Sequence, residues 1–287
     1  MPVTLRGANT RRKADRRLFL HRPSPLLLVG VLLAIPAAAQ EQGSVSVAIN
    51  GTAVKLSTVT YKPVGDGPFP TLIFHHGSGG FAHSYDPRAI AQWFVERGWV
   101  VIAPSRRGRG GSEGADEEGD ACSVANAVEG ADRALGEIDA VTSALISQPF
   151  VDRSRIAVGG QSRGGVLSVA WSGKHPEVRA VVNFVGGWKG SRTCLQAAAI
   201  NRTLLNRGVT WRQPSLWLYG DGDVFYPLED TKANFDAFLA AGGKGVWHDY
   251  KPPQMLNGHQ IALAPQLWSA DMDAYLADRG LPSKRRD

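Results

Sequence analysis

Cysteine is nearly absent from this chain of 287 residues. Only Cys122 and Cys194 occur, and neither forms a C-x-x-C pair or lies near a cluster of histidines, so we expect no metal site. An apolar run at residues 26–35 is about half as long as a membrane-spanning helix requires. The 33 glycines follow no triplet period, which excludes a collagen-like protein.

Net charge is also absent from most of the chain. The formal charge of +6 arises in residues 1–39, which hold seven basic residues and one acid. Positions 40–287 keep 25 basic and 25 acidic residues, so they offer no excess of positive charge to a polyanion. We therefore expect no nucleic-acid partner.

Residues 1–39 have the order of parts that is typical of an export signal. A basic stretch ends at Arg22, the apolar run at residues 26–35 follows, and Ala37-Ala38-Ala39 forms an A-x-A cleavage pattern before Gln40. Such a segment is removed from the exported protein. We expect a periplasmic or secreted protein without stable membrane insertion after cleavage. An uncleaved N-terminal anchor is the alternative.

The basic stretch suggests one export route. Residues 16–20, Arg-Arg-Leu-Phe-Leu, resemble the twin-arginine export signal of bacteria, and Asp15 stands where that signal usually has Ser or Thr. An ordinary secretory signal is the alternative interpretation.

Beyond the signal, the apolar residues alternate between the patterns of strands and helices. Hydrophobic residues make up 43% of the chain, enough for a sizeable core. Strands are predicted at 45–49, 54–61, 71–74, 99–103, 155–159, 178–185, 215–219 and 246–250. Helices are predicted at 88–97, 124–145, 166–171, 196–205, 231–241 and 265–277. This alternation predicts an α/β fold: one domain over 40–287, with a mostly parallel sheet, helices on both faces and a short insertion after strand 178–185.

The pattern G-x-S-x-G occurs twice, in different settings. Residues 110–114 follow their nearest predicted strand at a distance and are surrounded by acids and glycines. Residues 160–164 lie directly between a predicted strand and a predicted helix, which is the setting of a nucleophile elbow. We therefore predict that Ser162 is a nucleophile and that Ser112 is not. The other interpretation is a phosphate-binding turn, but no Gly-Lys-Ser/Thr or G-x-G-x-x-G motif is present there.

A nucleophilic serine needs a base and an acid that holds the base. Only three histidines follow Ser162, and His259 lies in a predicted loop before the last helix, from which a base can reach the serine. His175 and His248 fall at a helix end and within a strand. The loop after strand 215–219 offers Asp223 as the acid, in a G-x-x-D pattern, with Asp221 as the alternative.

Acyl transfer also needs donors for a developing oxyanion. We predict the backbone N–H groups of Arg163 and of Ser78, with Gly79 as a second choice for the latter. Ser78 lies in the turn after strand 71–74, where the adjacent His75 and His76 are expected to pack, because neighbouring side chains on a strand point to opposite faces.

Several side chains near strand ends are candidates for a substrate pocket. Tyr85, Trp188 and Trp211 are candidates to line it, although core or surface packing explains each equally well. The arginines of the loop after strand 99–103 are candidates to clamp a substrate carboxylate. Internal pairing with the acids of segment 113–120 is the preferred interpretation of these three residues, Arg106, Arg107 and Arg109.

Together these motifs resemble the α/β-hydrolase superfamily, especially its dienelactone-hydrolase-like branch. The resemblance covers about residues 45–280 and is carried by 76–80, 160–164, 220–223 and 257–259. It implies the α/β-hydrolase fold and a Ser-Asp-His triad. The founding dienelactone hydrolases use a cysteine nucleophile and act in the cytoplasm. This chain has serine and a predicted export signal, which puts lactone hydrolysis in doubt.

The expected function is hydrolysis of a small or soluble carboxylic ester by a serine enzyme without a cofactor. Ser162 attacks the ester, His259 moves the proton and Asp223 orients His259. Two alternatives remain open: a serine peptidase of the prolyl-oligopeptidase type, and a non-catalytic binding protein on a hydrolase scaffold. The peptidase usually carries a large N-terminal propeller, for which this chain has no room.

The two cysteines are expected to form a disulfide. An even pair in an exported protein suggests a bridge, and two buried free thiols are the alternative. Cys122 opens a long predicted helix, and Cys194 lies in the insertion after strand 178–185. Both segments should leave the carboxyl edge of the sheet, so the bridge should join two loops at the mouth of the site.

Overall fold

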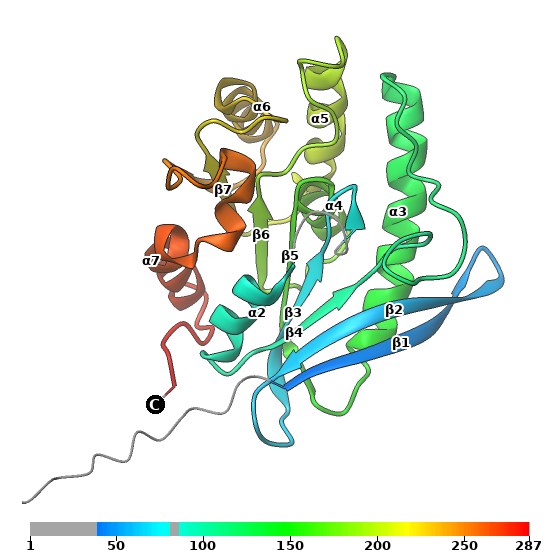
Figure 1. Cartoon of the computed structure of the whole chain (residues 1–287), viewed down its shortest axis with the longest axis vertical. Helices are drawn as coiled ribbons and strands as arrows, with labels where there is room; N and C mark the ends of the chain where they lie inside the picture. The colour runs from blue at the N-terminus through cyan, green and yellow to red at the C-terminus, as the bar shows by residue number, and fades with distance from the viewer. Residues whose placement is uncertain (1–38, 81–85, 287) are drawn as a thin grey trace, which may run out of the picture. The chain divides into compact units, whose positions relative to one another are not determined.

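Eight strands form one sheet in the part of the chain that the computed structural model describes, residues 39–80 and 86–286 (Figure 1). Their spatial order is β1-β2-β4-β3-β5-β6-β7-β8. The strands are β1 Ala39–Ile49, β2 Thr52–Lys62, β3 Phe69–His75, β4 Val100–Pro104, β5 Val151–Gln161, β6 Ala180–Phe184, β7 Ser215–Gly220 and β8 Gly245–Tyr250. From β4 to β8 the neighbouring strands are parallel, whereas β2 pairs antiparallel with both β1 and β4.

Burial explains the two kinds of strand. Every residue of β4 and β6 is buried, because helices cover both faces of a parallel sheet. The β1–β2 hairpin lies at the sheet's edge, and β2 buries alternate residues at its start.

The turn between β1 and β2 is formed by Asn50 and Gly51. Both residues have positive φ, 50° and 78°, the geometry that favours a tight turn between twisted strands.

Six described helices connect the strands, together with two short 3₁₀ helices. The helices are α2 Arg88–Val95, α3 Val124–Leu145, α4 Arg163–Ser172, α5 Ala197–Leu205, α6 Leu228–Ala240 and α7 Pro265–Ala277; the 3₁₀ helices are η1 Asn206–Gly208 and η2 Gly258–Leu263. None of the helices in the described ranges has the length and apolar character needed to cross a membrane.

Two neighbouring residues of β6 show that helices cover both faces. Phe184 packs edge-on against Trp268 of α7, with ring centroids 5.2 Å apart. Asn183 lies against α4, where a Cβ added to Gly165 would be 2.3 Å from the Asn183 Oδ1. Because adjacent strand residues point to opposite faces, α7 and α4 lie on opposite sides of the sheet (Figure 1).

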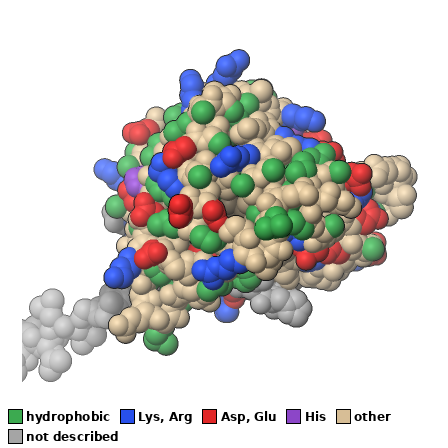
Figure 2. Space-filling view, turned by 90° about the horizontal axis from the view of Figure 1, so that it is seen from above, with side chains coloured by type: hydrophobic (Ala, Val, Ile, Leu, Met, Phe, Trp, Pro, Cys, Tyr) green, Lys and Arg blue, Asp and Glu red, His purple; other side chains and the backbone are tan. Residues whose placement is uncertain are grey.

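The α/β fold predicted from the sequence is confirmed, and the segment after β6 holds α5 as expected. The predicted loop around 257–260 is different, since it begins the 3₁₀ helix η2. The predicted export signal lies outside the described residues except for Ala39, the first residue of β1. Acidic and basic side chains are interspersed on the face in Figure 2.

The parallel strands β3, β5, β6 and β7 all end at one edge of the sheet. The loops that follow these strands therefore meet at that edge, which is where open α/β sheets place their ligand sites. The predicted catalytic residues lie on these loops or next to them.

Candidate active site

Ser162 occupies a sharp turn between β5 and α4. Its backbone angles, φ 58° and ψ −123°, lie in a region that residues other than glycine rarely adopt. The flanking glycines are required by close approach: a Cβ at Gly160 would lie 2.5 Å from the Gly164 carbonyl carbon, and one at Gly164 would lie 2.1 Å from the His75 oxygen. The second G-x-S-x-G pattern thus has the strained strand–turn–helix geometry of a nucleophile elbow.

The first G-x-S-x-G pattern has no such geometry. Ser112 Oγ donates to the Ser105 carbonyl at 2.7 Å and accepts from the Ser57 amide at 2.9 Å. These bonds tie the loop after β4 to β2, so Ser112 has a structural place away from the elbow.

Asp223 and His259 form a buried pair beside the elbow. Asp223 Oδ2 lies 2.8 Å from His259 Nδ1, and the two residues are only 3% and 4% exposed. Asp223 Oδ1 accepts the amides of Phe225 and Tyr226 at 2.8 and 2.9 Å. These bonds fix the carboxylate, and they leave Nε2 as the ring nitrogen of His259 that can serve as a base. Asp221, the alternative acid, is exposed.

Local hydrogen bonds hold His259 in place. Asn257 caps η2, its Oδ1 accepting the His259 amide at 2.8 Å, and Gln260 Oε1 accepts the Asn257 amide at 3.1 Å. Gln161, the residue before the serine, donates its side-chain amide to the His259 carbonyl at 2.9 Å. The segment that carries His259 is therefore bonded directly to the elbow.

The other two histidines after the serine have different surroundings. His175 stacks on Trp171, with ring centroids 3.5 Å apart. His248 lies within β8, its Nδ1 3.4 Å from Asp271. These contacts of the two rings lie outside the elbow and the Asp223 turn, so neither histidine takes the place of His259.

Tyr226 is a residue of the site that sequence reasoning missed. Its hydroxyl donates to the Gly187 carbonyl at 2.7 Å and lies 3.4 Å from Ser162 Oγ. Burial raises the pKa of Tyr226 to about 12, so the phenol stays neutral. Because its one proton is donated to Gly187, its oxygen can accept a hydrogen bond from the Ser162 hydroxyl. The only sequence signal is its place three residues after Asp223.

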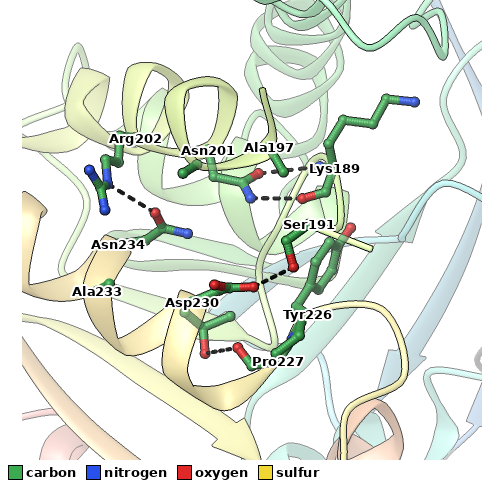
Figure 3. Close-up of a pocket in the computed structure, with 12 residues that line it drawn as sticks. Lys189, Ser191, Ala197, Asn201, Arg202, Tyr226, Pro227, Asp230, Ala233 and Asn234 are labelled. Carbon is green, nitrogen blue, oxygen red and sulfur yellow. Dashed lines mark hydrogen bonds between the residues drawn. The ribbon is translucent and has the colours of Figure 1, made fainter. Parts of the chain in front are cut away.

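A small cavity of about 50 Å³ borders Tyr226 and Pro227 (Figure 3). Its walls come from α5, α6 and the loop around Lys189. Hydrogen bonds line it, among them one from Ser191 Oγ to Asp230 Oδ2 at 2.5 Å. A space of this size holds about one or two water molecules or a very small group.

The turn after β3 lies against the nucleophile. A Cβ added to Gly77 would be 3.1 Å from the Ser162 Cβ, which is a tight contact, so the turn lies directly against the nucleophile. Ser78 follows directly and is exposed, while the Arg163 amide is at the N-terminus of α4, where the helix dipole favours negative charge. Both predicted oxyanion donors therefore belong to segments next to Ser162.

The adjacent histidines of this turn are buried. His76 Nε2 accepts the Arg106 amide at 2.9 Å, and His76 Nδ1 lies 2.6 Å from the Gly77 carbonyl. Nδ1 therefore carries the proton, and burial together with Arg106 holds the pKa of His76 well below its usual value. His75 is fully buried, and neither of its ring nitrogens has a hydrogen-bond partner among the described residues. Burial and Arg106 lower its pKa to about 3.

The three arginines of the loop after β4 pair internally, as preferred from the sequence. Arg106 pairs with Glu118 at 2.5 Å, Arg107 with Glu117 at 2.9 Å, and Arg109 with Asp116 at 2.5 Å. Arg107 also pairs at 2.7 Å with Glu137 of α3, which lies outside the predicted segment. Their guanidinium groups are thus held by carboxylates of the protein.

The aromatic residues that were predicted to line a pocket differ in burial and in their distance from the site. Trp188 is 2% exposed, and its ring lies 4.6 Å from the Arg163 guanidinium carbon, so it packs behind the elbow. Trp211 belongs to the core, and Tyr85 lies outside the described residues. Phe225, which was not predicted, is 56% exposed, with its ring 4.7 Å from that of His259.

The predicted disulfide is present. The Cα atoms of Cys122 and Cys194 are 5.3 Å apart, and the bridge joins the segment before α3 to the segment before α5. The Val124 amide also donates to Gln196 Oε1 at 3.2 Å, so the two segments are connected twice.

Comparison with known proteins gives the same fold. Over 129 residues the chain is 30% identical to esterase YjfP of Escherichia coli strain K12. That match covers 43% of this chain and 49% of the esterase, so the chain spans about half the length of this relative.

Two solved structures share the fold at low identity. A chain of Klebsiella pneumoniae subsp. pneumoniae MGH 78578, named as a dienelactone hydrolase, has a TM-score of 0.55 at 21% identity, covering 83% of this chain and 99% of the other. Esterase Pf2001 of Pyrococcus furiosus has a TM-score of 0.61 at 17% identity, covering 83% and 90%.

The model of the dienelactone hydrolase family matches residues 56–244. This range runs from β2 to Lys244, the residue before β8, and it includes the elbow at Ser162, Asp223 and both segments of the disulfide. The chain therefore belongs to the dienelactone hydrolase family and has the α/β-hydrolase fold.

Proposed function

We propose that this hydrolase cleaves small carboxylic esters through an acyl-enzyme formed on Ser162. The observation that carries the proposal is the buried Asp223–His259 pair, joined at 2.8 Å beside a strained serine turn. The family match and the esterase relative support the same reaction class.

The reaction follows from the roles of three side chains. Ser162 Oγ attacks the ester carbonyl while its proton passes to His259 Nε2, and Asp223 stabilises the imidazolium through Nδ1. The N–H groups of Ser78 and Arg163 stabilise the oxyanion. The C–O bond to the alcohol then breaks, and His259 gives the proton to the leaving oxygen. Water, activated by His259, releases the acid and restores Ser162.

The test is turnover of p-nitrophenyl esters of graded chain length and of a set of peptide amides. Ester turnover is expected, and turnover of amides without esters would favour a peptidase instead. Ser162→Ala should lose several orders of magnitude in kcat while it keeps its thermal midpoint, since it removes the nucleophile.

Ser112→Ala is the matched control, because it changes the serine of the other G-x-S-x-G pattern. It should keep kcat within about twofold, since it removes no group of the proposed chemistry. A fluorophosphonate adduct mapped by mass spectrometry should fall on Ser162. An adduct on Ser112, or an active Ser162→Ala variant, would contradict the assignment.

We also propose that residues 1–39 direct export, by the twin-arginine route, to the periplasm or beyond. The basic stretch, the apolar run and the A-x-A pattern support this, and a disulfide suits an oxidising compartment. In a bacterial host, the N-terminal residue of the exported protein should be Gln40, as intact-mass and peptide mass spectrometry can establish. Recovery of the full-length chain in the cytoplasm alone would contradict the proposal.

A further inference from the structure

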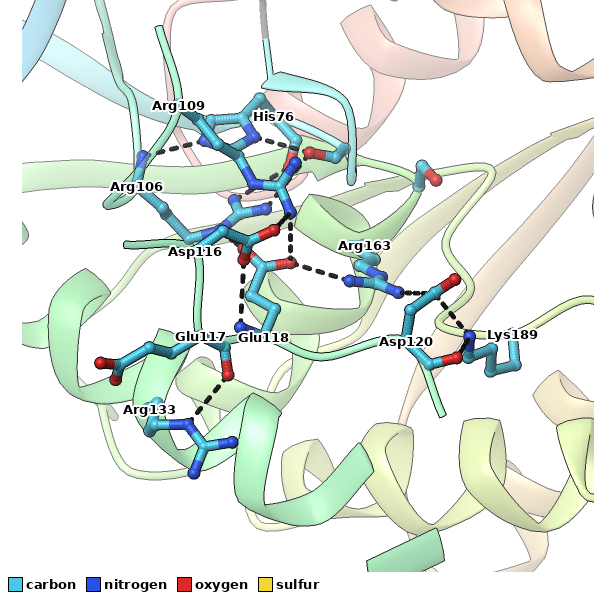
Figure 4. A network of polar contacts seen from close by, with 12 residues as sticks. His76, Arg106, Arg109, Asp116, Glu117, Glu118, Asp120, Arg133, Arg163 and Lys189 are labelled. Atoms are coloured by element: carbon cyan, nitrogen blue, oxygen red, sulfur yellow. Dashed lines mark hydrogen bonds and ion pairs between the residues drawn. The ribbon is translucent and has the colours of Figure 1, made fainter. Parts of the chain in front are cut away.

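Glu118 places a carboxylate in the protein interior between two arginines (Figure 4). Its Oε1 accepts from Arg106 Nε at 2.5 Å, and its Oε2 accepts from Arg163 Nη1 at 3.2 Å. Glu118 is only 5% exposed. Burial alone raises its pKa, but Arg106, Arg109 and Arg163 outweigh burial and hold the pKa at about 2. The carboxylate is therefore ionised throughout the neutral range.

The backbone that carries Glu118 is fixed by close packing. A Cβ added to Gly130 of α3 would lie 1.8 Å from the Glu118 carbonyl oxygen, so α3 contacts this loop where only glycine fits. The Glu118 amide also donates to Asp116 Oδ1 at 3.1 Å. The backbone from which the Glu118 carboxylate extends is therefore held in place.

Arg106, which pairs with Glu118, also donates hydrogen bonds to the turn after β3. Its Nη1 donates to the His76 carbonyl at 2.9 Å, and its Nη2 donates to the Gly77 carbonyl at 3.3 Å. The Gly77 carbonyl and the Ser78 N–H belong to one planar peptide unit. Fixing that carbonyl oxygen therefore fixes the direction of the Ser78 N–H, the first predicted oxyanion donor.

Arg163 supplies the second predicted donor from its own amide. Its guanidinium group is held by Glu118, by Asp120 at 2.7 Å and by the face of Trp188 at 4.6 Å. Lys189 Nζ bonds the same Asp120 carboxylate at 2.5 Å. The Arg163 side chain is thereby held in a buried position, and the Glu118 carboxylate contacts both Arg106 and Arg163, one on the side of each predicted oxyanion donor.

We propose that Glu118 is a positioning residue that aligns the two oxyanion donors through Arg106 and Arg163. The proposal rests on the ester-hydrolase function proposed above. The ion pairs of Glu118 run to Arg106, Arg109 and Arg163, so its effect should reach the reaction through the donors. Misaligned donors weaken binding of the transition state more than binding of the substrate. Loss of the carboxylate should therefore lower kcat and leave KM nearly unchanged.

The test compares Glu118→Gln with Glu117→Gln. The first substitution keeps the shape of the side chain but removes the negative charge that pairs with the guanidinium groups of Arg106, Arg109 and Arg163. Glu117 is the adjacent residue; its side chain is 44% exposed and pairs with Arg107 at 2.9 Å, so it does not reach either donor segment. With p-nitrophenyl acetate, Glu118→Gln should lower kcat about 10- to 100-fold with KM within about threefold, and Glu117→Gln should stay within about twofold of wild type.

A thionoester substrate separates alignment of the donors from a general loss of structure. Sulfur is a weaker hydrogen-bond acceptor than oxygen, so a well-aligned oxyanion hole favours the ester. Glu118→Gln should reduce the ratio of kcat/KM between ester and thionoester about tenfold relative to wild type. An unchanged ratio, a wild-type kcat, or an equal loss in Glu117→Gln would each overturn the proposal.

Two further variants make the outcome decisive. If Glu118→Gln does not fold, Arg106→Lys takes its place, because lysine keeps the charge beside Glu118 but cannot hold both carbonyls of the turn. It should show the same selective loss of kcat, and a wild-type kcat would overturn the proposal. Failure of the wild type to turn over any p-nitrophenyl ester would overturn the ester-hydrolase function itself, whereas wild-type turnover that is lost in Ser162→Ala and unaffected in Glu118→Gln would overturn only the role of Glu118.

Discussion

Asp223 distributes its two carboxylate oxygens over three donors. One oxygen accepts two backbone amides of its own turn, and the other lies against His259 Nδ1 at 2.8 Å. An acid held in this way orients the imidazole as well as balancing its charge. These contacts support Asp223 as the acid of the proposed triad more strongly than its place in a G-x-x-D pattern does.

Exchange of this acid for its amide should therefore stop turnover without unfolding the protein. Asp223→Asn should lower kcat for p-nitrophenyl acetate by about three to four orders of magnitude, since an amide can hold His259 in the wrong tautomer. The control is Asp221→Asn, at an exposed position two residues earlier, which should remain within about twofold of wild type. A larger loss in Asp221→Asn would transfer the role to Asp221.

The sequence predicts the residues of the site only where the local pattern carries them. Ser162 could be chosen over Ser112 because a strand and a helix flank it directly. Tyr226 could not be found, because it reaches Ser162 only through the turn that the Asp223 carboxylate organises. Glu118 could not be distinguished from the neighbouring acids of its loop, because no periodicity marks which carboxylate is buried.

At the scale of elements, period and composition predict most strands and helices. The buried strand β4 is a continuous apolar run, β6 is apolar except for Asn183, and α3 repeats its apolar residues at helical spacing. The sheet order is less accessible: β4 lies between β2 and β3, an arrangement set by pairing across long sequence separations. The 3₁₀ helix η2 was missed, because its six residues are too few to show a period.

The disulfide connects two elements, and its removal should lower stability more than it lowers turnover. It closes a loop over 72 residues, for which the chain-entropy model gives about 4 kcal/mol. Reduction should lower the thermal midpoint by roughly 10 °C for a domain of this size. Turnover at room temperature should fall less than about twofold, because neither sulfur takes part in the proposed chemistry.

Thermal melting with and without a reductant measures the first effect, and p-nitrophenyl acetate turnover measures the second. The paired variant Cys122→Ser/Cys194→Ser, unaffected by the reductant, is the control. Loss of turnover with an unchanged midpoint would show that the bridge acts on the chemistry instead.

At the scale of the whole molecule, buried histidines connect stability to pH. His75 ends β3 and His76 begins the turn that follows it, and both are buried close to Arg106. Burial and that guanidinium lower both pKa values, that of His75 to about 3. The folded protein therefore keeps both rings neutral under conditions in which an unfolded chain would protonate them.

The sign of the resulting pH effect follows directly. Below a pH of about 6.5 the unfolded chain binds a proton at His75 and the folded state does not, so stability is complete above that pH and falls as the pH drops towards 3. Glu118, with a pKa near 2, loses its contribution only at more acidic pH, below its unfolded pKa of about 4.5. The interval between pH 5 and pH 6.5 thus isolates the histidines from this carboxylate.

His75 alone should account for a loss of about 2 kcal/mol in the free energy of unfolding between pH 7 and pH 5. Urea unfolding at pH 7, 6 and 5 measures this loss in the wild type and in His75→Gln. The variant should show a pH slope reduced by that amount, whatever its absolute stability, because glutamine does not titrate; the remaining slope includes His76, which the variant retains. Equal slopes in the two proteins would mean that His75 binds its proton in the folded state as readily as in the unfolded chain, which its complete burial without a hydrogen-bond partner among the described residues argues against.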